Sequence, residues 1–207
     1  FIFRLLAITQ LLLSAEAASI VAEHTLPSNA TSWFNVGAGI GTDGAVFDNR
    51  QAQTFVPTAS GFLQDVSFNV YRINTTADLR VSITEVVGGQ PGTTLDSALL
   101  PLSSVGTTEL PSSFLLSGAF SHSAPMSGSL LLEAGVSYAL VFSSDTTEAN
   151  YRIYADRSGY SEGAHLRFQN SGPYVDAGGS DLLFRVTATA IPEPKATFLF
   201  VLASLVL

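Results

Sequence analysis

One short stretch of the chain carries residues whose types and spacing could perform catalysis. Gly159-Tyr160-Ser161-Glu162-Gly163 has the G-x-S-x-G spacing of a nucleophile elbow, and His165 and Asp156 lie nearby in the sequence. A nucleophile elbow places its serine between an entering strand and a leaving helix. Here strand-like sequences lie on both sides, at residues 151–154 and 164–168, so a β-hairpin loop is the better interpretation. We therefore predict no catalytic residues and no enzymatic activity.

Cation binding is the second kind of chemistry that the residue types allow. Hard cations such as Ca²⁺ take oxygen ligands from loop carboxylates, but the acids here lack the spacing of an EF-hand. Solvated loop acids are the simpler interpretation, and a structural calcium ion is the only cofactor that we leave open. The histidines are scattered and the chain has no cysteine, so we expect no zinc site. The acid pairs in predicted loops are Asp43 and Asp48, Asp145 and Glu148, and Asp176 and Asp181.

Aromatic side chains could provide flat surfaces for a sugar ring. We single out Tyr154 and Tyr160, which lie near one predicted loop, as candidate contacts to a glycan. Burial in the core explains the same residues equally well, and both interpretations stay open at this point. The wider set of aromatic candidates is Trp33, Tyr71, Tyr151, Tyr154, Tyr160 and Tyr174.

The composition excludes one class of partner and favours one class of structure. Charged residues make up 13% of the chain, with nine basic against seventeen acidic side chains. A chain without a basic surface cannot neutralise phosphates, so we expect no nucleic-acid partner. The many valine, threonine, phenylalanine, serine and glycine residues suit strands and turns better than helices.

Alternation of polar and apolar residues predicts the strands that must position these side chains. Phe62, Val66, Phe68 and Val70 fall on one face of a predicted strand, as expected for a period of two. Residues 136–142 are the most apolar stretch of the domain and predict a central strand. Residues 22–49 are polar and rich in glycine and predict one or two short edge strands with loops. Further strands are predicted at 53–56, 79–84, 95–105, 114–121, 150–155, 164–168 and 181–190.

Eight to ten short strands, without helical periodicity or an internal repeat, predict an all-β fold. We expect a single antiparallel β-sandwich, jelly-roll-like, over residues 22–190. Helices are expected only outside this domain, as an N-terminal signal helix and a C-terminal apolar helix.

Residues 1–18 have the features of a secretory signal peptide. Arg4 precedes the apolar run from Leu5 to Leu13, and Ala15 and Ala17 provide the small residues of a cleavage site, which we place after Ala17. An amphipathic first helix is the alternative, but the run shows no polar stripe at helical spacing. We therefore expect export.

Residues 191–207 form a tail that suits an address or an anchor. Pro192 and Pro194 each fix φ and lack a backbone N–H, so Pro192-Glu193-Pro194 disfavours the alternative of a final core strand. Residues 196–207 are uncharged, but they are fewer than the roughly 20 that a membrane-spanning helix needs. The chain begins at Phe1 rather than Met, and we expect further residues at both ends.

The tail resembles the PEP-CTERM sorting signal of Gram-negative bacteria, which combines a Pro-Glu-Pro motif, a transmembrane segment and a terminal basic cluster. The resemblance rests on Pro192, Glu193 and Pro194, and we expect the basic cluster beyond Leu207. It implies recognition by an exosortase-type membrane protease and transient or permanent attachment to the inner membrane. Delivery to the cell surface or extracellular matrix would follow.

The middle of the chain, roughly residues 50–190, resembles the extracellular domains called choice-of-anchor. That resemblance implies a surface β-domain and no enzymatic activity. Five segments carry it: 53–57, 61–66, 89–92, 132–140 and 181–185.

These features together predict an exported bacterial cell-surface or extracellular-matrix protein with a structural or adhesive role. The alternative is a carbohydrate-binding module on the same architecture, holding exopolysaccharide. A contiguous exposed aromatic patch would favour the alternative. Ser161 within hydrogen-bonding reach of His165 would instead favour a hydrolase.

Overall fold

The computed structural model describes residues 17–26, 31–40, 46–73, 75–144, 150–157, 159–170 and 172–191, with the backbone alone at 31, 38–40, 46 and 47. Strands dominate this part of the chain, and all their pairings are antiparallel. The predicted all-β class and antiparallel pairing are confirmed. The predicted signal and tail helices lie outside the described residues.

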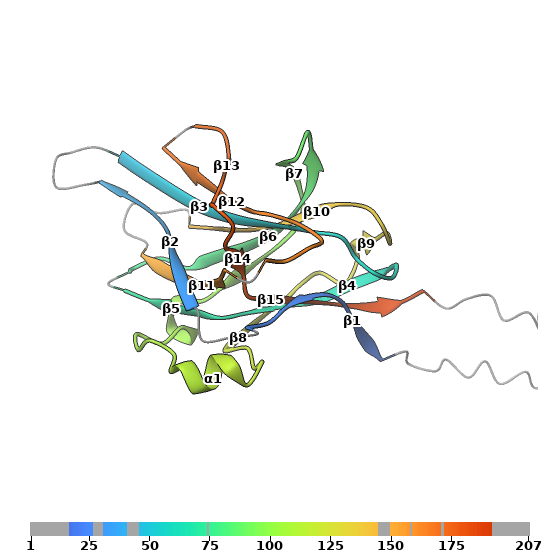
Figure 1. The fold of residues 1–207 in the computed structure, drawn as a ribbon, viewed down its shortest axis with the longest axis horizontal. Helices are drawn as coiled ribbons and strands as arrows, with labels where there is room; N and C mark the ends of the chain where they lie inside the picture. Colours follow the sequence, from blue (N-terminus) through green and yellow to red (C-terminus); the bar gives the residue numbers. More distant parts are fainter. Residues whose placement is uncertain are drawn as a thin grey trace, which may run out of the picture.

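The smaller sheet has five strands in the described chain. β1 and β15 pair along their whole length, with Ala18 opposite Thr189 and His24 opposite Phe184. The described chain therefore enters and leaves the domain side by side, at the right of Figure 1. The order is β1 (Ala18–His24), β15 (Phe184–Ala190), β4 (Gly61–Phe68) and β8 (His122–Pro125), with β9 (Leu131–Leu132) also pairing with β4.

The larger sheet has ten strands in the described chain. The predicted central strand is confirmed, because β10 lies between β3 and β6. The main order is β14 (Asp181–Leu182), β11 (Tyr151–Asp156), β2 (Thr31–Ile40), β3 (Val46–Phe55), β10 (Tyr138–Ser143), β6 (Leu79–Val87) and β7 (Gln90–Leu100). In addition, β12 (His165–Gln169) pairs with β3 and with β13 (Val175–Asp176), and β5 (Val70–Arg72) pairs with β11.

One hydrophobic core fills the space between the two sheets. Alternation along the strands places Val66 and Phe68 of β4, and Leu140 and Phe142 of β10, in this core with no exposed area. Phe68 and Phe142 meet edge to face, with ring centroids 4.9 Å apart. Fully burying one such side chain contributes roughly 1.5–3 kcal/mol, so apolar contact between the sheets is a main source of stability.

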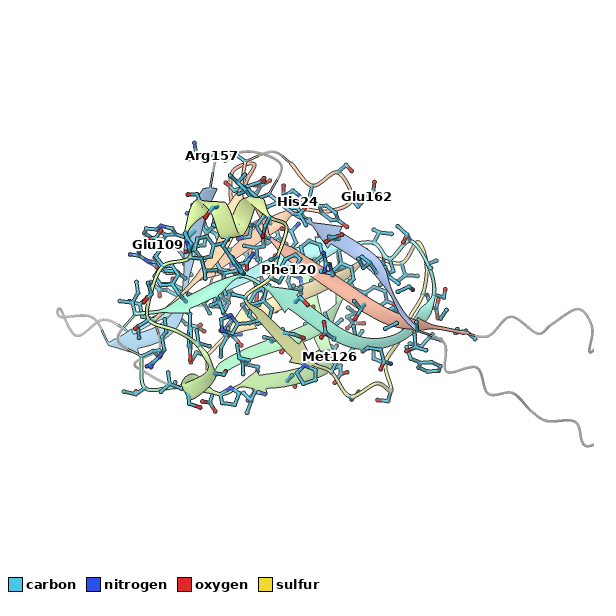
Figure 2. The ribbon with its side chains drawn as sticks, turned by 90° about the horizontal axis from the view of Figure 1, so that it is seen from below. His24, Glu109, Phe120, Met126, Arg157 and Glu162 are labelled. Atoms are coloured by element: carbon cyan, nitrogen blue, oxygen red, sulfur yellow. The ribbon has the colours of Figure 1, made fainter. Side chains whose placement is uncertain are left out.

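A second apolar cluster lies on the opposite face of β5 and β11, beneath the segment that contains α1 (Ser112–Leu116). The strand predicted at 114–121 is wrong. The chain there forms α1 after Pro111, and the N–H of Phe114 donates locally to the Pro111 carbonyl. Burial of Leu115 beside Tyr154 favours this helical turn over an extended strand. The segment continues to Phe120, whose ring lies 4.9 Å from the Arg185 guanidinium, near the middle of Figure 2.

Three further expectations differ from the structure. β2 is not an edge strand, because its two halves pair with β11 and β3. β1 begins at Ala18, so the domain starts before the predicted Ala22. Phe62 does not share the buried face of Val66 but is 40% exposed. The β4–β15 ladder shifts at this point, where Asp65 and Leu63 oppose consecutive residues of β15, and the intervening extra residue reverses the face.

A buried polar link joins strand β3 to β14. The Gln53 side chain has no exposed area. Its Nε2 donates to Oδ1 of Asp181 at 3.0 Å, and its Oε1 accepts the backbone N–H of Leu182 at 2.9 Å. The other Asp181 oxygen accepts the backbone N–H of Tyr160 at 2.8 Å. Each of these groups is buried or half-buried, so each depends on the others for its hydrogen bonds.

We predict that Gln53→Leu lowers the free energy of unfolding by about 2–4 kcal/mol, because it leaves buried partners at Asp181 and Leu182 unsatisfied. Urea denaturation measures the loss. Gln64→Leu is the control, since the amide of Gln64 donates to the Phe62 carbonyl in an exposed setting, and we expect a change below about 0.5 kcal/mol. Equal effects of the two substitutions would contradict the structural role of Gln53.

Candidate functional site

The G-x-S-x-G stretch connects two strands that do not pair with each other. β11 pairs with β2, β5 and β14, whereas β12 pairs with β3 and β13. Strands do flank the loop as predicted, but the predicted hairpin is wrong. Figure 2 shows Glu162 of this loop at the surface, on the same side of the molecule as His24.

The three residues that could have formed a catalytic group are held apart by other partners. Ser161 is exposed, and its Oγ donates to the Glu162 carboxylate at 3.2 Å. Asp156 is fully buried, and its Oδ1 lies 2.9 Å from Nε2 of His24. His165 contacts Gln51 instead, and no hydrogen bond joins Ser161 to His165 among the described contacts. Among the described contacts, Ser161 therefore has a carboxylate neighbour but no histidine.

Close packing explains the last glycine of the motif. A Cβ atom at Gly163 would lie 1.8 Å from the carbonyl oxygen of Thr54. The contact is this short because the next residue, Ala164, exchanges hydrogen bonds with Thr54: its carbonyl accepts the Thr54 N–H at 2.9 Å, and its N–H donates to Thr54 Oγ1 at 2.7 Å. Gly163 is therefore required for the chain to pass β3.

We predict that Gly163→Ala lowers the free energy of unfolding by about 3 kcal/mol or more, because backbone atoms must move to admit the methyl group. Thermal unfolding measures the effect. Gly106→Ala is the matched control, because a Cβ there meets nothing within 4 Å and its φ is not in the positive range. A Gly163→Ala variant as stable as Gly106→Ala would show that the fold does not require the close approach of Gly163 to Thr54.

His165 is a buried neutral side chain. It is 2% exposed and its ring meets Phe34 edge-on, with centroids 4.4 Å apart. Gln51 donates its amide N–H to the Asn35 carbonyl at 2.7 Å, which turns Gln51 Oε1 toward His165 Nε2, 2.9 Å away. The proton of the neutral ring is therefore on Nε2. Burial lowers the pKa of His165 to about 4, against smaller opposing effects of the Ser180 carbonyl and Asp176.

This pKa predicts acid destabilisation. Since the folded pKa of about 4 lies below the ordinary value of 6.5, protons bind preferentially to the unfolded chain. His165 makes its full contribution to the free energy of unfolding above pH 6.5. This contribution is lost as the pH falls toward 4, by up to about 3 kcal/mol. A shallower pH dependence is expected for His165→Gln, and NMR titration of the ring in the wild type should show no protonation near pH 6. Protonation at the ordinary pKa would contradict the prediction.

The two tyrosines predicted as glycan contacts are not exposed platforms. Tyr154 is 1% exposed, and its hydroxyl accepts the N–H of Leu110 at 2.7 Å, so its predicted contact with a glycan is wrong. Tyr160 is half-buried between His24 and Phe184, and burial raises its pKa to about 12. Among the other described candidates, Tyr71 and Tyr151 are buried, Tyr174 is half-buried and Trp33 is exposed beneath the Arg152 guanidinium. Of these six candidates only Trp33 is exposed, so they form no contiguous exposed patch.

The loop acids that the structure describes are engaged by the protein. Asp48 pairs with Arg50 at 2.6 Å, and Asp176 accepts the N–H of Gly178 at 2.6 Å. In the described ranges, no three histidine, cysteine, aspartate or glutamate side chains converge to hold a metal ion. Asp43, Asp145 and Glu148 lie outside these ranges, and a structural calcium ion stays a prediction.

The sorting motif Pro192-Glu193-Pro194 also lies outside the described residues. Of the helices that the described chain forms, none has the length and apolar character needed to cross a membrane.

The structure instead reveals a polar groove of about 300 Å³ on the outward face of the larger sheet. Its floor follows from strand register: Ser82 pairs with Val141, and Arg80 pairs with Ser143, so these side chains share the face opposite to the core. Figure 1 shows β7 and β13 projecting toward the same side, at the top of the view. The lining residues are Arg50, Arg80, Ser82, Thr84, Pro91, Gly92, Thr94, Val141, Ser143, Ser144 and Tyr174.

The groove combines hydroxyl groups with two arginines. Arg50 and Arg80 are the only charged residues among the lining residues, although Arg50 also pairs with Asp48 outside the lining. Thr84 is 4% exposed, and its hydroxyl has no hydrogen-bond partner among the described residues. Such a surface can bind a polar, anionic group, since arginine recognises carboxylates through charge-assisted hydrogen bonds.

Sequence reasoning did not identify this groove. The alternation in residues 79–84 correctly predicts a strand with Arg80, Ser82 and Thr84 on its polar face. The signal is therefore present, but a polar face usually indicates contact with solvent. Only the pairing with β7 and β10 shows that the hydroxyl groups lie together in a concave site.

In comparisons with known proteins, no protein-family model matches this chain, and no curated protein is significantly similar to it.

Proposed function

We propose that the chain is an exported bacterial protein, directed to the cell surface or extracellular matrix by a PEP-CTERM type of sorting tail, with a structural or adhesive role. The observation that carries this proposal is Pro192-Glu193-Pro194 followed by the uncharged residues 196–207. A signal-peptide pattern over residues 1–18 supports it from the other end of the chain. Under this proposal, an exosortase-type membrane protease recognises the tripeptide while the tail lies in the inner membrane.

The position of the folded domain supports this division of the chain. β1 begins at Ala18, directly after the predicted cleavage position, and β15 ends at Ala190, directly before the predicted tail. Cleavage after Ala17, or removal of residues 191–207, would leave the β1–β15 ladder complete. The proposed domain is one jelly-roll-like antiparallel sandwich. Support comes from the single main core, to which strands of both sheets contribute.

A carbohydrate-binding module is the second candidate function. The six candidate aromatic residues do not form the patch that would have favoured it, but the groove on the larger sheet is a separate observation in its favour. Hydroxyl groups beside the half-buried ring of Tyr174 are typical of a surface that recognises sugars.

Glu193→Ala tests the sorting proposal. We expect the wild-type product of the complete gene to lose its tail and reach the surface, while the variant stays in the inner membrane at greater mass. Fractionation followed by mass spectrometry measures both properties. Glu133→Ala, at an exposed glutamate of the domain, is the matched control and should behave as wild type. Identical processing of all three proteins would show that the tripeptide is only a linker.

A further inference from the structure

The hydroxyl group of Thr84 is the first indication that the groove holds a ligand. Thr84 lines the groove and is only 4% exposed, and its buried hydroxyl has no hydrogen-bond partner among the described residues. A buried hydroxyl without a partner destabilises the folded protein. A ligand oxygen in the groove would supply the missing partner.

The pleat of the sheet arranges the other polar groups around Thr84. Thr94 pairs with Thr84 across the β6–β7 ladder, and Ser82 lies two residues away on the same face. Neighbouring strands lie about 4.8 Å apart, and same-face residues about 7 Å apart along a strand. Side-chain hydroxyls with this spacing can form hydrogen bonds to several hydroxyl groups of one saccharide.

The charge in the groove points to an acidic saccharide. Arg80 pairs with Ser143, and Phe142 pairs with Gln51, so the next residue along β3, Arg50, approaches the same end of the floor. No acidic side chain lines the groove, although the whole chain carries a net charge of −8. A guanidinium has five N–H donors, so Arg50 can pair with Asp48 and still donate to a bound carboxylate. Two arginines with no acidic lining residue beside them suit the carboxylate of one sugar unit.

Apolar contacts complete the site. Val141 and Tyr174 belong to one small apolar cluster on this face, and the Tyr174 ring is held 5.4 Å from that of Phe168. An apolar surface next to hydroxyl groups matches the C–H face and the hydroxyl edge of a sugar ring, whereas a small inorganic anion would use only the arginines.

We propose that this groove binds a uronic-acid unit of an extracellular polysaccharide, with Arg80 and Arg50 attracting the carboxylate, Thr84 hydrogen-bonded to a ring hydroxyl and Tyr174 against the sugar face. The polysaccharide as the natural source rests on the proposed extracellular location. The binding itself is measured on purified protein, so its failure and the failure of the sorting proposal are distinguishable.

The test is calorimetric titration of the full chain with trigalacturonate and, as a neutral ligand of the same shape, its methyl ester. We expect the acid to bind at least tenfold more tightly than the ester, and Arg80→Gln to weaken acid binding at least tenfold. Arg167→Gln removes the same charge from an exposed site on β12 that does not line the groove, and should leave binding unchanged.

Thr84→Val separates ligand binding from folding. Removal of an unpartnered hydroxyl should leave thermal stability equal or higher, while trigalacturonate binding weakens several-fold. The proposal is overturned if the ester binds as well as the acid, or if Arg80→Gln and Arg167→Gln behave alike. Inorganic sulfate that competes as strongly as the trisaccharide would show a simple anion site and would also overturn it.

Discussion

The side-chain amide of Gln53 lies near the C-terminal end of β3, at a position where alternation predicts an apolar residue. Its hydrogen bonds determine how the C-terminal part of the described chain joins the larger sheet. The amide contacts both the carboxylate of Asp181 and the backbone of Leu182. Asp181 is only 5% exposed, and a buried carboxyl group is tolerated only when its oxygens have hydrogen-bond partners. Because Asp181 also accepts the Tyr160 N–H, this amide helps to position both β14 and the loop between β11 and β12.

The same constraint explains why a sequence with a catalytic spacing has a structural role. The loop that contains Ser161 is held at Tyr160 by Asp181 and passes Thr54 so closely that only glycine fits at position 163. His165 then enters the interior and bonds to Gln51, while Asp156 bonds to His24 of β1. Asp156 and His165 therefore form hydrogen bonds between strands, and these bonds hold both side chains away from Ser161.

The sequence predicts the parts of this fold that depend on local alternation. Strands β6 and β15 follow from the period of two, whereas β10 follows from its continuous apolar run, which is buried on both faces. Three kinds of feature depend on distant partners and could not be predicted. The bulge in β4 turns the Phe62 side chain to the opposite face of the strand. Contact with Tyr154 stabilises α1 after Pro111, and Tyr154 is in turn buried by the segment that contains α1. The groove likewise depends on which strands become neighbours.

The place of β15 within its sheet has a mechanical consequence. β15 lies between β1 and β4 and pairs with both over nearly its whole length, as far as Ala190. A pull at Ala190 that is directed along the strand axis and resisted by the larger sheet would load both ladders in shear, so several backbone hydrogen bonds would have to break together. Resistance to such a pull is set by the rate of forced unfolding rather than by the equilibrium free energy. The last strand of the described chain is thus held on both sides against a pull in this direction.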